Sequence, residues 1–217
     1  AVEQLEAART DKTKVLVLNS PSNPTGMIYS REELLAIGNW AVAHDVLILA
    51  DDIYGRLVYN GNEFVPISSL SEAIRKQTIV INGVSKAYAM TGWRVGYAVG
   101  NPEIIAAMSK LTGQTTSNLT AVSQYATIEA LTGPQDSVET MRQAFEERLN
   151  TIYPLLCQVP GFEVVKPQGA FYLFPNVKKA MEMKGYTDVT EFATAILEEV
   201  GLALITGCLL YTSDAAD

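Results

Sequence analysis

The chain has 217 residues, 48% of them hydrophobic, which is enough to bury one sizeable core or one domain and part of another. Its net charge of −8 argues against a nucleic-acid partner bound through a basic face and against an anionic membrane surface. One histidine and two cysteines do not support a zinc site or a disulfide framework, and no bilayer-spanning run or signal peptide is visible. We therefore expect no metal and, by default, a cytoplasmic location.

Short apolar runs alternate with helical patterns over the first hundred residues. The apolar runs predict buried strands at 14–19, 46–50, 79–81 and 95–99. Between the first two, Ser30 and Glu33 have the spacing of a capping box, which predicts a helix that ends near Ala43. His44 falls at the end of this pattern, so we expect it to have a structural role at the helix end. The alternation predicts an α/β fold with an open, mostly parallel sheet and helices on both faces.

The pattern changes in the second half of the chain. Helical patterns follow one another at about 102–114, 118–131 and 135–158. Near the end of the last one, Cys157 follows two leucines and is expected to be a small core residue. After Pro160, apolar segments predict an antiparallel pair, a further helix and a final strand, at 162–165 with 170–174, about 188–200, and 202–207.

This change of pattern predicts two domains. Residues 1–148 would form a large domain, and residues 149–207 part of a smaller α+β domain joined to it through the long helix. Residues 208–217 continue with neither periodicity nor a helix cap, and we interpret them as an anomalous, non-native tail. Ala1 also replaces the usual initiator methionine, so the chain is interpreted as a fragment cut at both ends.

Three polar clusters follow predicted strands, and ligands of open parallel sheets bind beyond the carboxyl ends of the strands. The clusters are Asn19–Gly26, Asp51–Tyr54 and the segment around Lys86. A lysine amine can form a Schiff base with a carbonyl cofactor such as pyridoxal phosphate (PLP), although a lysine near a turn is more often a solvated surface residue. Arg94 offers a planar fork of donors for a phosphate, and Ser85 lies in a turn that could complete a phosphate cradle.

The other two clusters carry complementary chemistry. A pyridine ring is a good electron sink only when its nitrogen stays protonated, and a buried carboxylate favours that form. Asp51, which we place first after its strand, is the candidate, and Asp52 would point the opposite way; a strand-end aspartate without function is the alternative. Tyr54 and Asn23 can donate hydrogen bonds to the phenolic oxygen of the cofactor. Lys86, once released, can carry a proton between the substrate Cα and the cofactor.

Four segments in this order resemble those of the class I/II aminotransferases, the PLP-dependent family with the aspartate aminotransferase fold. They are Asn19–Gly26, Ala50–Tyr54, Gly83–Gly96 and Lys166–Tyr172. The resemblance covers about 12–207 and implies an incomplete PLP-transferase large domain with part of the small domain. It implies that Lys86 holds the cofactor and moves the proton, and that the intact protein is a homodimer. The roles that it implies for the remaining residues are pairing of Asp51 with the ring nitrogen, contact of Tyr54 and Asn23 with the ring hydroxyl, and phosphate binding by Ser85 and Arg94.

The chain also departs from the family. The glycine-rich phosphate loop and the ring-stacking aromatic residue would lie before Ala1, and the arginine that clamps the substrate carboxylate would lie beyond Gly207. Gly83 stands three residues before the lysine, where the family often has serine. Because misplacement of a substrate can cost orders of magnitude in rate, we predict that the chain by itself is inactive or nearly so.

The resemblance favours an aminotransferase that moves an amino group between an amino acid and a 2-oxo acid by a ping-pong route. Aspartate with 2-oxoglutarate is the favoured pair, with aromatic amino acids or alanine as alternatives. A PLP-dependent β-lyase of the same fold is a second hypothesis, because fold does not fix reaction type. The third is the aminotransferase-like domain of a transcription regulator, whose DNA-binding module would precede Ala1.

Overall fold

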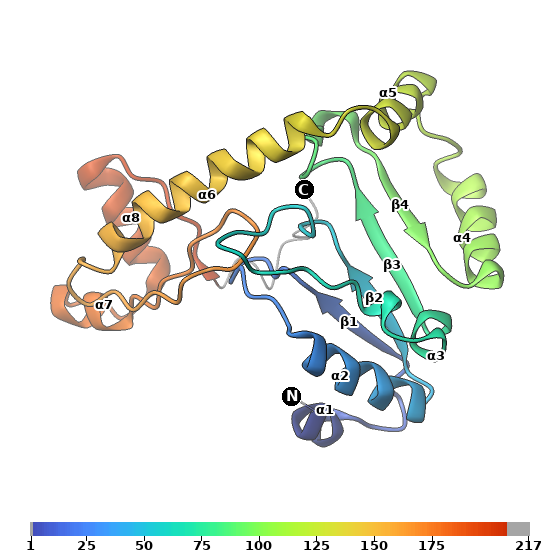
Figure 1. Cartoon of the computed structure of the whole chain (residues 1–217). Helices are drawn as coiled ribbons and strands as arrows, with labels where there is room; N and C mark the ends of the chain where they lie inside the picture. Colours follow the sequence, from blue (N-terminus) through green and yellow to red (C-terminus); the bar gives the residue numbers. More distant parts are fainter. Residues whose placement is uncertain (1, 208–217) are drawn as a thin grey trace. The chain divides into compact units, whose positions relative to one another are not determined.

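A computed structural model describes residues 2–207 (Figure 1). Its sheet has four strands in the order β1-β2-β3-β4, which span Val15–Asn19, Leu47–Asp51, Thr78–Gly83 and Gly96–Val99. The first three strands are parallel, and β4 is antiparallel to β3. The predicted α/β class with a mostly parallel sheet is therefore confirmed. One boundary was wrong, because Asp51 is the last residue of β2 rather than the first residue after it.

One face of the sheet packs on helices, and this packing makes the main core. Helix α2 (Arg31–Ala43) turns Leu34 and Ile37 toward Leu18, Ile48 and other buried residues, all 8% exposed or less. The short elements α1 (Val2–Ala8), η1 (Ile67–Ser69) and α3 (Glu72–Lys76) contribute further apolar side chains to this cluster: Val2, Leu5, Ile67 and Ile74. On the opposite face of β1, Val15 and Val17 are 48% and 65% exposed.

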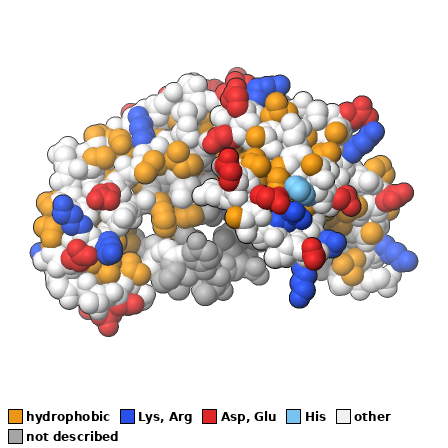
Figure 2. All heavy atoms as spheres, turned by 90° about the horizontal axis from the view of Figure 1, so that it is seen from below, with side chains coloured by type: hydrophobic (Ala, Val, Ile, Leu, Met, Phe, Trp, Pro, Cys, Tyr) orange, Lys and Arg blue, Asp and Glu red, His pale blue; other side chains and the backbone are white. Residues whose placement is uncertain are grey.

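Helix α2 begins and ends as the sequence predicts. The Ser30 hydroxyl accepts a hydrogen bond from the Glu33 amide, and the Glu33 carboxylate accepts one from the Ser30 amide, which completes the capping box. His44 is the C-cap residue, and its Nε2 lies 3.2 Å from the Glu6 carboxylate. The Trp40 indole donates to the same carboxylate at 2.8 Å. His44 thus has the predicted structural role, and the surface around it carries interspersed acidic and basic side chains (Figure 2).

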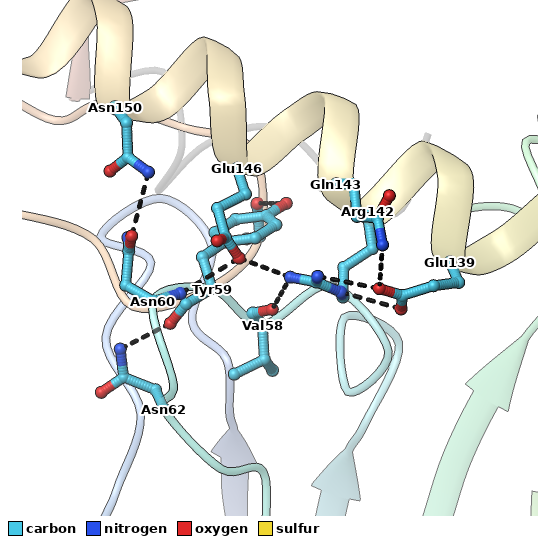
Figure 3. Close-up of polar contacts among 10 residues, drawn as sticks. Val58, Tyr59, Asn60, Asn62, Glu139, Arg142, Gln143, Glu146 and Asn150 are labelled. Carbon is cyan, nitrogen blue, oxygen red and sulfur yellow. Dashed lines mark hydrogen bonds and ion pairs between the residues drawn. The ribbon is translucent and has the colours of Figure 1, made fainter.

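A short 3-10 turn, η2 (Thr91–Trp93), precedes β4, and three helices follow this strand. They are α4 (Pro102–Thr115), α5 (Ala121–Thr132) and α6 (Asp136–Leu156), close to the predicted spans. Arg142 of α6 donates to Glu146 at 2.5 Å and to the Val58 carbonyl at 3.1 Å, and Glu146 accepts from the Asn60 amide (Figure 3). This network fastens α6 to the segment 58–62. No helix of the described residues is both long and apolar enough to cross a bilayer.

The chain divides into two compact units. The first contains residues up to Asn150 together with Lys166–Leu173, and the second contains Thr151–Val165 and the residues from Phe174 onward. The division falls within α6, near the predicted boundary at residue 148. The domain boundaries themselves stay a prediction, and the interpretation of 208–217 as an anomalous tail lies outside the described residues. The second unit contains α7 (Lys178–Lys184) and α8 (Val189–Val200), the latter at the predicted place.

Three local predictions for this part of the chain were wrong. The segments 162–165 and 170–174 do not pair; Glu163 instead bridges to Asn176, and Gly169 bridges to Val58. The reason is that the Ala170 amide donates to Leu57 and its carbonyl accepts from the Tyr59 hydroxyl, so its backbone is used in the first unit. The described residues at 202–207 form no strand. Cys157 is exposed, because it lies just beyond the last turn of α6.

Candidate active site

The carboxyl ends of β1 and β2 are joined by an asparagine. Asn19 and Asp51 are register partners at the ends of these parallel strands. The Asn19 side-chain nitrogen donates to the Asp51 backbone carbonyl at 3.4 Å. The Asn19 side-chain oxygen accepts from the Asn23 backbone amide at 2.7 Å. One side chain therefore holds the loop with Asn23 next to the strand end that carries Asp51. Sequence reasoning included Asn19 in the first polar cluster but assigned it no role, although its position at the end of an apolar run was the available signal.

The two aspartates at the end of β2 have different surroundings. Asp51 is half-buried, and its carboxylate accepts from the Ile53 amide at 3.2 Å. Burial raises the pKa of Asp51, while the hydrogen bonds from Ile53 and Asn19 lower it. Asp52 is buried, and burial together with the charge of Asp51 raises its pKa to about 7. Asp51 is thus the carboxylate with hydrogen-bond donors around it, as a partner of a cationic group needs.

Tyr54 lies three residues beyond the strand and is 2% exposed. Its hydroxyl oxygen is 2.5 Å from that of Tyr172, which comes from the returning segment 166–173. Burial is the main reason that the pKa of Tyr54 is raised; the Tyr172 hydroxyl and the charge of Asp51 raise it further, and a hydrogen bond from the Asn23 side chain lowers it. Asn23, Asp51 and Tyr54, which were predicted separately, therefore lie within one polar cluster.

Lys86 stands in the turn that directly follows β3. Its Nζ atom lies 5.9 Å from the ring centre of Tyr54 and 5.7 Å from that of Phe171. Phe171 stacks in turn on Phe145 of α6, with ring centres 5.3 Å apart. A cation is attracted to the faces of aromatic rings at such distances, so the two rings hold the amine beside the Tyr54 cluster.

Ser85 and Arg94 lie at the two ends of the segment that follows β3. The Ser85 carbonyl accepts from the Met90 amide at 3.1 Å, which folds the segment back on itself. Arg94 has a left-handed backbone with φ of 55°, is exposed, and donates to the Thr91 carbonyl at 3.3 Å. A Cβ atom on Gly83 would lie 2.7 Å from the Val95 carbonyl oxygen. This backbone therefore requires glycine at the place where the family often has serine.

The donor set fits PLP. A buried tyrosine hydroxyl and an asparagine amide suit a phenolic oxygen, the Asp51 carboxylate has lone pairs left for a protonated ring nitrogen, and the Lys86 amine suits an aldehyde. An exposed guanidinium suits a phosphate. Tyr172 and Phe171 were missed as site residues, because the resemblance included their motif but assigned them no role.

The fold and the residues gathered at the strand ends have the features of the aminotransferase class. The family model for aminotransferases of class I and II matches residues 1–214, and the chain belongs to that family.

Individual relatives agree with this assignment. The chain is 79% identical over 206 residues to an asparagine–oxo-acid transaminase of Streptococcus mutans, with 95% of this chain and 52% of the relative covered. It is 58% identical to an aspartate aminotransferase of Bacillus sp. (strain YM-2), with 94% and 52% covered. The chain thus spans about half the length of the curated relatives it matches.

Solved structures show the same fold. An aspartate aminotransferase from Rhizobium meliloti superposes with a TM-score of 0.89 and 37% identity, covering 96% of this chain and 54% of that one. An aromatic aminotransferase from Pyrococcus horikoshii superposes with a TM-score of 0.87 and 33% identity, covering 94% and 54%.

Proposed function

We propose that the protein transfers an amino group between an amino acid and a 2-oxo acid with PLP as its cofactor, by a ping-pong route. The observation that carries the proposal is the position of the Lys86 amine in the turn after β3, beside the cluster of Asn23, Asp51 and Tyr54. Membership of the class I and II aminotransferase family supports it. PLP supplies, when bound, an aldehyde that reacts with amines and a ring that stabilises negative charge at carbon.

Lys86 and Asp51 carry the proton chemistry of this proposal. The Lys86 Nζ would hold the cofactor. Once released from it, the amine would take the proton from the substrate Cα and deliver it to the exocyclic carbon of the cofactor. Asp51 stabilises a protonated ring nitrogen, because a half-buried carboxylate interacts more strongly with a nearby cation than a solvated one does.

The remaining residues bind and orient. The Tyr54 hydroxyl and the Asn23 amide donate to the phenolic oxygen of the ring, and Tyr54 is rigid because it is buried. Arg94 and Ser85 bind the phosphate, the former by charge-assisted hydrogen bonds and the latter through its hydroxyl and backbone amide. The Lys86 amine, packed beside two aromatic rings, is kept near the reacting carbon.

Aspartate with 2-oxoglutarate is the proposed substrate pair. Asparagine is a second candidate, because the relative with 79% identity is named for it. We also propose that the intact protein is a cytoplasmic homodimer. The β-lyase and transcription-regulator alternatives are not favoured, since the relatives cited above are named as aminotransferases. That the chain alone is inactive or nearly so stays a prediction.

Covalent labelling tests the centre of the proposal. The chain is incubated with PLP, reduced with borohydride, and digested so that the labelled peptide can be mapped. We expect the label on Lys86, its loss in Lys86→Ala, and its retention in the matched control Lys110→Ala on α4. Labelling of another lysine, with Lys86→Ala still binding PLP normally, would contradict the assignment. Transamination assays with aspartate and with asparagine, on a protein of the relatives' full length, then decide the substrate.

A further inference from the structure

The hydroxyl group of a second tyrosine, Tyr172, contacts the hydroxyl group of Tyr54. The two hydroxyl oxygens are 2.5 Å apart although the residues are 118 positions apart in the chain. Their rings meet edge to face, with centres 5.7 Å apart and planes 79° to each other. This is a direct hydrogen bond between two phenols, and a phenol can both donate and accept.

The hydrogen bonds around Tyr54 leave a defined task for Tyr172. The hydrogen bond from the Asn23 side chain lowers the pKa of Tyr54 and so favours the ionised form of Tyr54. The Asn23 side-chain amide is therefore the donor and the Tyr54 hydroxyl oxygen the acceptor. If Tyr172 also donates to that oxygen, the Tyr54 proton is directed away from both partners and toward a ligand. If Tyr54 donates to Tyr172 instead, its proton is held until a ligand oxygen competes for it.

Tyr172 is held in place by the backbone of the returning segment. The amides of Gln168 and Gly169 both donate to the Gly26 carbonyl at 2.9 Å. The Ala170 amide donates to Leu57 at 2.9 Å, and the Gln168 side chain accepts from the Ile28 amide at 3.0 Å. The Gln168 carbonyl accepts from the Tyr59 amide at 2.9 Å, and Tyr59 belongs to the segment 58–62 that contacts α6 (Figure 3). The hydroxyl of Tyr172 therefore meets Tyr54 from a fixed direction.

We propose that Tyr172 is a positioning residue that acts through Tyr54: its hydroxyl orients the Tyr54 hydroxyl toward the phenolic oxygen of the cofactor. The proposal rests on the proposed function and assigns a residue to which the resemblance gave no role. Two charged groups also face Tyr54, namely Asp51 from β2 and Lys86 from the turn after β3. A substitution at Tyr172 leaves both in place, so their electrostatic effect on Tyr54 is the same in the variant and in the wild type.

The first arm of the test needs no cofactor. The chain is labelled with ¹³C at the tyrosine Cζ atoms, and the Tyr54 resonance is assigned by its loss in Tyr54→Phe. Tyr172→Phe removes one hydroxyl and keeps the ring that packs against Phe171. We expect this variant to shift the Tyr54 resonance, while Tyr125→Phe, a change at a 75% exposed tyrosine, leaves it in place. An unchanged Tyr54 resonance in folded Tyr172→Phe would overturn the proposal.

The second arm measures the bound cofactor by absorbance rather than by activity. A weaker donor at the phenolic oxygen raises the pH at which the bound PLP changes its visible spectrum. We expect an upward shift of roughly half a pH unit in Tyr172→Phe and a larger one in Tyr54→Phe. The double variant should match Tyr54→Phe alone, because Tyr172 acts only through Tyr54. Additive shifts would show that Tyr172 acts independently and would refute the relay.

The two arms separate this inference from the function on which it rests. A wild-type chain that bound no PLP would count against the proposed function, while the Tyr54 resonance would still decide whether Tyr172 holds Tyr54. If the chain binds PLP but the Tyr54 resonance is unchanged in Tyr172→Phe, the proposed function is retained and the positioning role of Tyr172 is rejected.

Discussion

Gly26 is the point where the first polar loop receives the returning segment, and replacing it should destabilise the first unit strongly. Its φ of +67° is a backbone conformation that residues with a side chain rarely adopt. An added Cβ would lie 2.5 Å from the Pro167 side chain and 2.6 Å from the Gly169 carbonyl oxygen. The left-handed backbone costs alanine about 1–2 kcal/mol. Overlap with packed atoms adds roughly 1–3 kcal/mol, so Gly26→Ala should cost about 2–5 kcal/mol.

A second glycine separates the two contributions. Gly61 has a φ of +73°, but an added Cβ would lie within 4 Å of no atom of the described residues other than its own chain neighbours. Gly61→Ala therefore carries only the backbone cost of about 1–2 kcal/mol. Both changes reduce the entropy of the unfolded chain equally, so this effect cancels in the comparison. The difference between the two variants measures the contact of Gly26 with the returning segment.

Urea unfolding followed by the fluorescence of Trp40 is a suitable assay, since this indole is 8% exposed and belongs to the main core. Gly26→Ala should lower the free energy of unfolding by about 1–3 kcal/mol more than Gly61→Ala does. Equal losses in the two variants would refute the reasoning, because they would mean that segment 166–173 yields to the added methyl group without cost.

Three further predictions concern the core, a helix cap and a buried acid. Leu34→Ala should cost about 2–5 kcal/mol of unfolding free energy in the same urea assay, whereas its 41% exposed neighbour Leu35→Ala should cost far less; similar losses would contradict the assigned packing of α2. Ser30→Ala should cost about 1 kcal/mol and Ser30→Asp should retain most of the stability, and an equal loss in both would exclude the cap as the cause. Because the pKa of Asp52 is raised from 3.8 to about 7, the folded state keeps a proton that the unfolded state releases, and its stabilising effect is lost as the pH rises from 4 to 7. The thermal midpoint of Asp52→Asn, measured relative to wild type, should therefore be higher at pH 8 than at pH 4. The exposed control Asp11→Asn should show no such difference between the two pH values. An effect of Asp52→Asn that is independent of pH would refute this linkage.

The parts of the fold that the sequence predicts well are those that depend on neighbours along the chain. The apolar runs that became β1, β2 and β3, and the capping box at Ser30, are local signals. The apolar segments 162–165 and 170–174 are local signals as well, but a strand pattern does not state its partner. Gly169 pairs with Val58, more than a hundred positions earlier, so the predicted hairpin failed where the partner was distant.

The same distinction applies to the candidate site. Lys86 and Tyr54 could be predicted as neighbours because polar residues that follow parallel strands gather at one edge of the sheet. The contacts of Tyr172 with Tyr54 and of Phe171 with Lys86 depend on the segment 166–173, which is distant in sequence from both partners and belongs to the same unit. Strand periodicity carries no information about contacts between such distant segments. The resemblance included the motif of these two residues, but only the structure shows what they contact.

The pair Asp51 and Asp52 shows how far periodicity can be taken. Alternation along a strand predicts that the two carboxylates point in opposite directions, but it cannot say which one meets a ligand. The register of β1 with β2 decides, because it places Asn19 beside Asp51 and so connects that carboxylate to Asn23 and Tyr54. Asp52 is more deeply buried, and its raised pKa reflects that burial. The strand on one side of these chemically identical neighbours thus gives them different surroundings: Asp51 has the hydrogen-bond donors that its proposed role needs, and Asp52 is a buried acid.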